Sequence, residues 1–466
     1  MTTERADEST RRDFIKTAAA SAMAASHAAS QTGAANENKA ESEPADLPNI
    51  VVIFTDDQGY QDLGCFGSPN IKTPQIDQMA EEGMRLTDFY VAASICSPSR
   101  AALLTGCYPP RVGITSVLFP GNVIGLDPSE TTIASLLKKK GYATACVGKW
   151  HLGHLPQFLP TAHGFDSYFG IPYSNDMDAV QTENGRIFNV PIMRNEEIIE
   201  RPAVQETLTQ RYTEEALRFI RGNHDSPFFL YLAHTMPHVP LYASEGFVGK
   251  SERGLYGDTI EEIDWSTGRI LETLRELGID ENTLVVFTSD NGPWLQKKED
   301  GGCALPLRGG KFSVYEGGFR VPCVMRWPGT IPAGTVCSEV VSSIDLLPTI
   351  AALAGSDLPE RAIDGEDVGE TLRDPEASAP DRHFYFYRGA NLRAVRRGNW
   401  KLHLAGGANE KNKNPAELYQ LDADIAESEN AAEANEAVVE RLTGAARRFD
   451  AQLKDQARGP GRAEKE

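Results

Sequence analysis

The segment NIVVIFTDDQG, from Asn49 to Gly59, is an unbroken apolar run that stops at two adjacent aspartates. Uniformly apolar strands are typical of parallel sheets covered on both faces, because neither side of such a strand meets water. Three later segments share this form and end in polar side chains: YATACVGKWHLG at Lys149 and His151, PFFLYLAHTMPH at His234 and His238, and NTLVVFTSDNG at Asp290 and Asn291. The pattern predicts an α/β fold with a large mixed, mostly parallel sheet flanked by helices.

The segments between these strands have helical patterns. TTIASLLKKKG ends at Gly141, as a helix should, and the segment from Thr259 to Leu277 begins with a capping box formed by Thr259 and Glu262. In open α/β sheets, ligands bind at the carboxyl ends of the strands. The four polar clusters are therefore predicted to face one crevice.

The pattern changes from about Leu358, where RHFYFYRG, LRAVRRGNWKLHL and AELYQLD read as antiparallel strands with one solvated face. A helix is predicted after them, from about Ala431 to Leu453. We therefore predict a catalytic domain over residues 48–357, a smaller C-terminal α+β subdomain with an antiparallel sheet over 358–455, and a charged tail over 456–466.

Composition excludes some classes of function. The chain has 466 residues, 41% of them apolar, and a formal net charge of −20 at pH 7. This acidity argues against nucleic acid as a partner, because binding to phosphates requires a basic surface. No apolar run approaches the length that crosses a bilayer, so no membrane span is predicted.

The N-terminal segment STRRDFIKTAAASAMAASHAAS combines paired Arg11 and Arg12 with an Ala-rich, weakly apolar run and small residues suited to cleavage. It resembles a twin-arginine export signal; an Ala-rich helix with a basic start is the alternative. We predict a signal peptide over residues 1–29 and a disordered leader over 30–47. The twin-arginine export machinery would then deliver the protein to a bacterial periplasm or to the extracellular space.

The stretch ICSPSRAALLTG places Cys96 where a helix is expected to begin, with Ser97 as the N-cap and Pro98 at the first helical position. Unpaired N–H groups at this helix end, together with Arg100 one turn on, predict an anion site centred on the sulfur atom. The seven cysteines have no CxxC spacing, so they predict no zinc cluster. The odd thiol is assigned to Cys96, and the other six cysteines could pair.

Asp56, Asp57, Asp290 and Asn291 bring three carboxylates and an amide oxygen to the ends of two strands. Either pair alone could be a turn or an N-cap. Three crowded carboxylates need a counter-charge, however, and their oxygens suit a hard divalent cation. Ca²⁺ fits flexible carboxylate ligation in an export compartment, and Mg²⁺ is the alternative.

Further polar groups are predicted at the same crevice. Lys149 and His151 alternate with Trp150 at a strand end, so they should point the same way. His238 follows HTMP, and Lys311 follows a Gly-Gly pair that lets the backbone approach a ligand. Together with the Arg100 helix end, these groups are donors for a small tetrahedral oxyanion beside a metal.

The motifs CSPSR with AALLTG, FTDDQGY, GKWHLG, FTSDNG and RGGK…EGGFRVP resemble those of the type I sulfatases, of the arylsulfatase A and N-acetylgalactosamine-6-sulfatase kind. The resemblance spans the chain from about Pro48 into the predicted C-terminal sheet. It implies the alkaline phosphatase-like fold and oxidation of Cys96 to Cα-formylglycine by a formylglycine-generating maturation enzyme. Its aldehyde hydrate would complete the metal site, and Arg100 would steady that hydrate and Asp57.

The resemblance also implies how the remaining residues act. One hydroxyl of the hydrate would attack sulfur while Lys149 and Lys311 hold the sulfate oxygens. His238, alone or with Lys311, would protonate the departing alcohol. His151 would then take a proton from the second hydroxyl, and sulfate would leave by C–O cleavage.

The sequence indicates less about the residues that contact the part of the substrate beyond its sulfate group. Relatives often carry a histidine where this chain has Asp300, so the resemblance does not extend to that part of the site. His154, Asn175, Asp176 and His234 are candidates to line the substrate pocket. A sulfated carbohydrate is the expected substrate, with aryl sulfates as surrogates.

Two other functions remain open at this point. A phosphomonoesterase or phosphonate hydrolase on the same scaffold would need a second metal, with more His and Asp ligands than the sequence offers. A noncatalytic sulfated-glycan binding protein would require that Cys96 stay a thiol.

Overall fold

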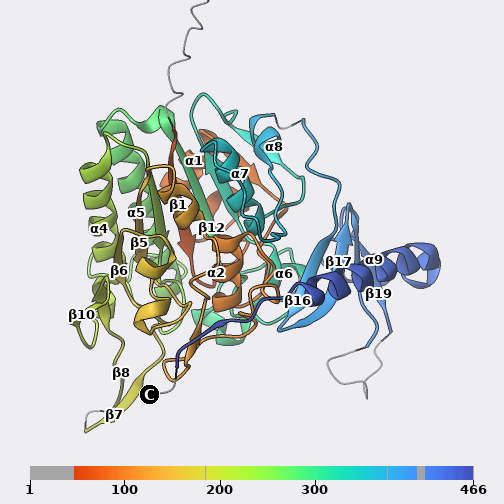
Figure 1. Cartoon of the computed structure of the whole chain (residues 1–466), viewed down its shortest axis with the longest axis horizontal. Helices are drawn as coiled ribbons and strands as arrows, with labels where there is room; N and C mark the ends of the chain where they lie inside the picture. The colour runs from red at the N-terminus through yellow and green to blue at the C-terminus, as the bar shows by residue number, and fades with distance from the viewer. Residues whose placement is uncertain (1–46, 184, 375, 407–414, 465–466) are drawn as a thin grey trace, which may run out of the picture. The chain divides into compact units, whose positions relative to one another are not determined.

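The computed structural model describes residues 47–464 except 184, 375 and 407–414 (Figure 1). The predicted signal peptide, and the predicted leader up to residue 46, lie outside the described residues. Within the described part of the chain, no helix is both long and apolar enough to cross a membrane.

β1 (Asn49–Thr55) lies inside a ten-stranded sheet, between β11 (Phe228–Ala233) and β12 (Thr283–Ser289), and is parallel to both. β5 (Ala143–Gly148) and β6 (Ser167–Gly170) continue the parallel set beyond β11. The full order is β10 (Glu197–Glu200), β9 (Ile192–Arg194), β6, β5, β11, β1, β12, β13 (Cys323–Arg326), β2 (Met84–Leu86) and β14 (Thr335–Cys337). The predicted mixed, mostly parallel sheet is therefore confirmed.

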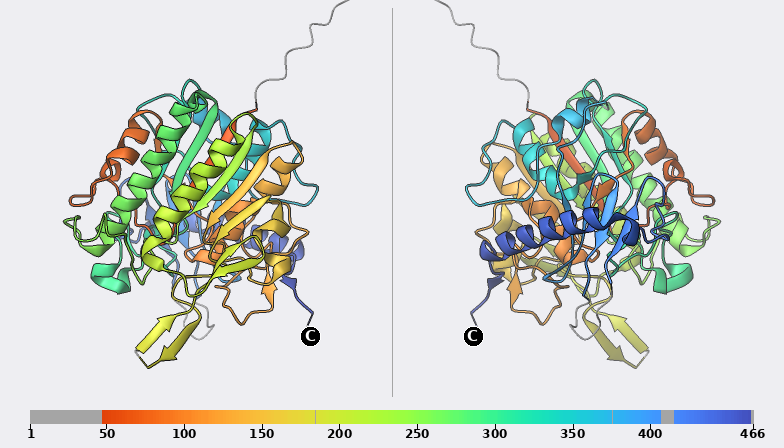
Figure 2. Two further views of the ribbon diagram at one scale, coloured as in Figure 1. Left: turned by 90° about the vertical axis from the view of Figure 1, so that its left-hand side faces the viewer. Right: turned by 90° about the vertical axis from the view of Figure 1, so that its right-hand side faces the viewer.

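Helices cover both faces of this sheet. Ile50, Val52 and Phe54 of β1 pack on one side, and Val51 and Ile53 pack on the other. The first side carries α2 (Cys96–Thr105), α3 (Ile133–Lys138) and α7 (Leu346–Leu353), and the second carries α1 (Pro74–Glu81), α4 (Leu208–Asn223) and α5 (Leu255–Glu276). The left view of Figure 2 shows the second side. Burial on both faces explains why the β1 sequence is apolar without alternation.

The C-terminal strands form a separate antiparallel sheet, in the order β16 (Phe384–Arg388), β17 (Asn391–Arg397), β18 (Trp400–His403) and β19 (Glu417–Gln420). α9 (Glu436–Asp455) crosses it, as the right view of Figure 2 shows. Phe384 and Phe386 of β16 share a core cluster with Leu442 of α9 and with Tyr90 and Phe319 of the larger part. The expected antiparallel sheet and helix are present, with the helix beginning a few residues later than predicted.

The smaller elements complete the chain. They are β3 (Phe89–Tyr90) paired with β15 (Val341–Ser342), the hairpin of β7 (Ala179–Thr182) and β8 (Gly185–Phe188), α6 (Glu316–Phe319) and α8 (Gly369–Arg373). The segment expected as a charged tail returns to the larger part, where β20 (Gly461–Arg462) pairs with β4 (Ile124–Gly125). Arg458 adds an ion pair to Glu130 there.

Two helix starts differ from the predictions, because the expected capping side chains have other partners. α2 begins at Cys96, and the Ser97 hydroxyl accepts the Leu118 N–H at 3.1 Å instead of capping the helix. Pro98 still lies in the first turn, where its missing N–H costs nothing. α5 begins at Leu255, one turn early, so Thr259 lies inside the helix and donates to the Tyr256 carbonyl.

Candidate active site

The polar clusters that follow the four central strands meet at one edge of the sheet, as predicted. Asp56 and Asp57 directly follow β1, and the Asp57 N–H donates to Asp290 Oδ1, after β12, at 3.1 Å. Lys149, after β5, donates from Nζ to Asp56 Oδ2. His238, beyond β11, has Nε2 3.6 Å from Asp57 Oδ2. Neighbouring parallel strands therefore bring residues that are far apart in sequence close together at this edge of the sheet.

Asp56 lies at the centre of this charge cluster and is fully buried. Its Oδ2 receives Lys149 and lies 3.5 Å from Nη2 of Arg100. Burial alone would raise the pKa of Asp56, but Lys149, His238 and Arg100 outweigh it and hold that pKa well below its usual range. Asp56 is therefore a carboxylate, and among residues 47–464 as described, its second oxygen, Oδ1, has no hydrogen-bond partner.

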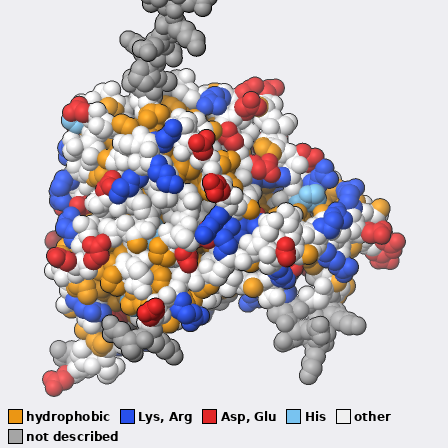
Figure 3. Space-filling view, viewed as in Figure 1, with side chains coloured by type: hydrophobic (Ala, Val, Ile, Leu, Met, Phe, Trp, Pro, Cys, Tyr) orange, Lys and Arg blue, Asp and Glu red, His pale blue; other side chains and the backbone are white. Residues whose placement is uncertain are grey.

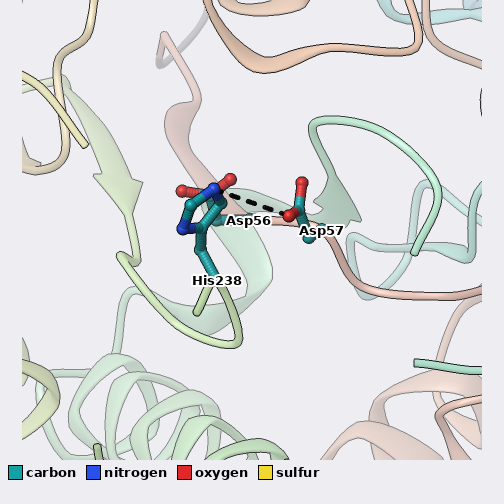
Figure 4. A group of neighbouring side chains, drawn as sticks. All are labelled: Asp56, Asp57 and His238. Atoms are coloured by element: carbon teal, nitrogen blue, oxygen red, sulfur yellow. Dashed lines mark ion pairs between the residues drawn. The ribbon is translucent and has the colours of Figure 1, made fainter. Parts of the chain in front are cut away.

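Asp57 sits beside Asp56 with its backbone in the left-handed region, at φ 64°. Its Oδ2 receives the Lys311 ammonium at 2.7 Å, and its Oδ1 receives Nδ2 of Asn291 at 2.7 Å. Burial raises the pKa of Asp57, with Lys311 acting in the opposite direction. Figure 4 shows Asp56, Asp57 and His238 converging; their ligand atoms lie within 4.8 Å of one another.

Arg100 pairs with a different carboxylate from the one expected. Its Nε and Nη2 donate to Asp290 Oδ2 at 3.0 and 2.8 Å, and Nη1 donates to the Lys149 carbonyl at 2.9 Å. The predicted partner was Asp57, which Lys311 neutralises instead. Burial, with the neighbouring Asp56, raises the pKa of Asp290 to about 7. The guanidinium fork therefore orients Asp290 and offsets its charge.

The oxygen atoms in this cluster fit a divalent cation. Asp56 Oδ1 and Asn291 Oδ1 are both buried without a hydrogen-bond partner in the described part of the chain. Buried oxygens without partners are costly unless an ion or water satisfies them. Carboxylate and amide oxygens are the ligands that Ca²⁺ and Mg²⁺ prefer. His238, for which proton transfer is predicted, is a further nearby donor.

Cys96 is the first residue of α2 and is 2% exposed. Burial raises the pKa of its thiol, even though Lys149 and Lys311 are close enough to act in the opposite direction. Unmodified, the side chain is therefore a neutral thiol rather than an activated nucleophile. All seven cysteines lie among the described residues, and all are free, so the pairing considered for the other six does not occur.

Lys149 and His151 are not part of the strand. β5 ends at Gly148, and His151 adopts the left-handed region at φ 61°, so the expected two-residue alternation does not apply. His151 Nε2 lies 3.0 Å from the Leu118 carbonyl, which can only accept, so Nε2 carries the proton. Nδ1 is a buried acceptor without a hydrogen-bond partner among the described residues. Burial, with Lys149 and Arg100, lowers the pKa of this imidazole well below its usual range.

The four candidate pocket residues differ in their surroundings, and their contact with substrate stays a prediction. Asn175 lies behind His238, with Oδ1 3.2 Å from its Nδ1 and Nδ2 donating to Gln205. His234 is fully buried, 3.4 Å from Ser266 of α5, where burial lowers its pKa to about 3. His154 is half-buried against Tyr173. Asp176 has one buried oxygen, Oδ1, without a partner in the described part of the chain.

Two side chains that lie at the site were not predicted from the sequence. Ser174 accepts from Lys149 Nζ at 3.2 Å and lies 3.5 Å from His238 Nδ1, and its position next to Asn175 was the available signal. Trp294 has the Lys311 ammonium 4.7 Å from its ring centroid and His238 5.9 Å away. Trp294 follows Asn291 by three residues, which was the corresponding signal.

Comparisons with known proteins identify relatives of this chain. A family model described as Sulfatase matches residues 48–356, and one described as N-sulphoglucosamine sulphohydrolase, C-terminal, matches residues 310–452. N-acetylgalactosamine-6-sulfatase of Rattus norvegicus is 44% identical over 384 residues, which cover 77% of this chain and 71% of that protein. Arylsulfatase A of Homo sapiens is 42% identical over 381 residues, covering 77% and 75%.

The fold is also similar to solved structures. The crystal structure of Ps i-CgsB in complex with k-i-k-neocarrahexaose superposes with a TM-score of 0.78 at 32% sequence identity. The superposition covers 89% of this chain and 95% of that chain. The similarity therefore includes the C-terminal sheet as well as the larger one.

Proposed function

The chain belongs to the sulfatase family and is a sulfuric ester hydrolase, and from this premise we propose that it hydrolyses sulfate esters of carbohydrates. The observation that carries the proposal is the set of buried cations around Cys96. Lys149 and Arg100 are fully buried and Lys311 is 4% exposed, each paired with a carboxylate of the site. Such a cluster suits one small tetrahedral oxyanion.

We propose that one divalent cation, Ca²⁺ with Mg²⁺ as the alternative, is held by Asp56, Asp57, Asp290 and Asn291 together with the modified Cys96. When bound, the cation supplies Lewis acidity to the sulfate group and to the nucleophilic oxygen. The buried oxygens of Asp56 and Asn291, which have no hydrogen-bond partner within the described structure, support this ligand set. Arg100 maintains it by fixing Asp290 through two hydrogen bonds.

We propose that Cys96 becomes Cα-formylglycine through a formylglycine-generating maturation enzyme, and that its hydrate provides the nucleophilic hydroxyl. A buried neutral thiol would otherwise be a poor nucleophile. The surrounding side chains support the assignment, because residue 96 lies at the N-terminus of α2, where both Lys149 and Lys311 are near enough to counteract the rise in the pKa of its thiol.

The chain's own cations would bind the sulfate, and His238 would serve the leaving alcohol. Lys149 and Lys311 would donate to sulfate oxygens. His238 Nδ1 is 2.6 Å from the Val239 carbonyl, so it is the protonated nitrogen, and Nε2 is the atom presented to the site. We propose that the imidazolium form of His238, protonated at both nitrogens, gives its Nε2 proton to the leaving oxygen and becomes the neutral Nδ1–H form, with the Lys311 ammonium as a second donor.

His151→Ala should lower kcat by about 100-fold or more, as loss of a general base typically does. Nδ1 of His151, which has no hydrogen-bond partner among the residues described, is the acceptor atom of the proposed base, and the bond from Nε2 to the Leu118 carbonyl orients it. Steady-state kinetics with a sulfated sugar measures the change, and inhibition by inorganic sulfate should stay within about threefold of the wild type. His163→Phe, which alters a buried histidine outside the site, should keep kcat. An unchanged kcat in His151→Ala would contradict the assignment.

A carbohydrate leaving group fits a protein whose sulfate-binding cations are confined to the interior. On the face shown in Figure 3, Lys and Arg side chains are interspersed with Asp and Glu. Tight binding of one sulfate would come from the buried cluster, and specificity from polar and neutral contacts with the alcohol. We also propose export by the twin-arginine machinery to the periplasm or beyond, where sulfated polymers or their fragments arrive.

The purified, matured protein should release sulfate from at least one member of a panel of sulfated mono- and oligosaccharides. Aryl sulfates should be turned over as surrogates, and phosphate monoesters should be turned over at least about 100-fold less efficiently in kcat/KM. The readout is ion chromatography of released sulfate and phosphate. Release of phosphate without release of sulfate from any sugar would favour the phosphomonoesterase. Binding of sulfated sugars without any turnover would favour a noncatalytic binding protein.

A further inference from the structure

Lys311 lies in the loop that follows the 3₁₀ helix η6 (Leu295–Asp300) and leads to α6. Its ammonium must nevertheless reach Asp57, 2.7 Å away, from a backbone that includes Phe312 in the left-handed region at φ 71°. Two backbone bonds attach the middle of the loop to the site: the Lys311 N–H donates to the Pro293 carbonyl and the Phe312 N–H to the Ser94 carbonyl. The ends of the loop need other partners.

Both ends of this loop are held by one residue from the C-terminal part. Arg308, at the start, donates from Nη1 to the Glu427 carbonyl at 2.6 Å. The backbone N–H of Glu316, at the end, donates to Oε2 of Glu427 at 2.6 Å. The Gly317 N–H closes the loop on itself by donating to the Arg308 carbonyl at 2.8 Å. Glu427 therefore spans the base of the loop that carries Lys311.

The antiparallel sheet in turn fixes the Glu427 carboxylate. Lys401 Nζ and His403 Nε2, both on β18, lie 3.0 and 2.8 Å from its Oε1, and the side chain is 0% exposed. Lys401 also pairs with the Glu316 carboxylate at 2.9 Å. The Glu427 backbone is left-handed at φ 51°, a strained conformation for a residue other than glycine. Strain of this kind persists where surrounding contacts over-determine the conformation.

We infer that Glu427 is a positioning residue for Lys311. The C-terminal sheet fixes the Glu427 side chain, and Glu427 binds both ends of the 308–316 loop. The loop in turn positions the Lys311 ammonium at the proposed sulfate site. A displacement of a catalytic group by about 1 Å can lower the reaction rate by about 100-fold. A contact remote from the reacting atoms, such as that of Glu427, can therefore control the rate. The inference rests on the proposed role of Lys311 and gives the C-terminal sheet a part in catalysis.

Two substitutions separate the reach of the side chain from its charge. Glu427→Asp keeps the negative charge beside Lys401 but shortens the reach to the Glu316 N–H, and Asp tolerates the left-handed backbone. It should lower kcat for a sulfated sugar by about tenfold and speed amide hydrogen exchange in a peptide spanning residues 308–317. Glu427→Gln keeps an oxygen within reach of that N–H and should stay within about threefold of the wild-type kcat.

A double-mutant cycle with Lys311→Ala tests whether the effect passes through Lys311. In the Lys311→Ala background, Glu427→Asp should change kcat by less than about twofold. Glu130→Asp, which shortens a buried carboxylate paired with Arg458, is the matched control and should keep kcat. Equal losses from Glu427→Asp in both backgrounds, or a larger loss in Glu427→Gln than in Glu427→Asp, would overturn the inference.

The cycle also separates this inference from the proposed function. Full activity of Lys311→Ala would remove the catalytic role of Lys311 itself. A strongly impaired Lys311→Ala together with an unimpaired Glu427→Asp would leave that role intact and reject Glu427 as its positioning residue.

Discussion

Cys96→Ala is expected to lower kcat for sulfate ester hydrolysis by about 10⁴-fold or more, because the substitution removes the proposed nucleophile. The side chain at this position is almost completely buried at the N-terminus of α2, where the alanine leaves the helix start unchanged. The variant should therefore unfold at nearly the wild-type temperature. Kinetics with a sulfated sugar, alongside thermal unfolding, measures both quantities.

Cys146→Ala is the matched control, since it removes a fully buried thiol from the interior of β5. It should cost stability through the cavity that it leaves but keep kcat. Peptide mass spectrometry of active protein, made together with the maturation enzyme, should show an aldehyde or its hydrate at residue 96. Free cysteine alone in a fully active sample would reject the proposed mechanism.

Asp290→Asn should weaken Ca²⁺ binding by at least about 100-fold and reduce sulfatase activity in parallel. The substitution removes one of the proposed ligand charges and the carboxylate whose Oδ2 accepts two hydrogen bonds from the buried Arg100 guanidinium. Titration calorimetry of the chelated protein with Ca²⁺ measures the affinity independently of turnover. Readdition of the cation to the chelated wild-type protein should restore its activity.

Asp264→Asn is the control for this experiment. Asp264 is a buried aspartate of α5 that accepts the N–H groups of Gln75 and Ile76, and no described contact links it to the site. The control should bind one equivalent of Ca²⁺ with wild-type affinity. Two equivalents of metal in the wild-type protein, or full activity after exhaustive chelation, would instead favour the phosphomonoesterase alternative.

The strands and the shared edge of the sheet could be predicted because their signals are local. A run such as that of β1 is apolar because both of its faces are buried, and this requirement is visible in seven consecutive residues. The carboxyl ends of neighbouring parallel strands lie at one edge, so Asp56 after β1 and Asp290 after β12 had to approach each other once those strands were adjacent.

Helix starts and side-chain partners were harder to predict from the sequence. Each depends on competition among groups that are distant along the chain. Ser97 fails to cap α2 because the Leu118 N–H, 21 residues away, occupies its hydroxyl. Arg100 pairs with Asp290 rather than Asp57 because Lys311, 254 residues from Asp57, already neutralises that carboxylate. Residue types and spacing indicate which groups such a side chain can bind. The packing of the folded chain determines which of these groups it contacts.

The residues proposed to do chemistry could thus be predicted from short motifs, whereas their arrangement depends on long-range contacts. The chemical identity of Cys96, Lys149 and His151 is a local property, as is the tendency of the preceding residues to form strands. The left-handed turn at His151 and the hold of Glu427 on the Lys311 loop have no local signal. Both arise because burial forces each polar group to find a partner, and the folded chain alone determines which partner is within reach.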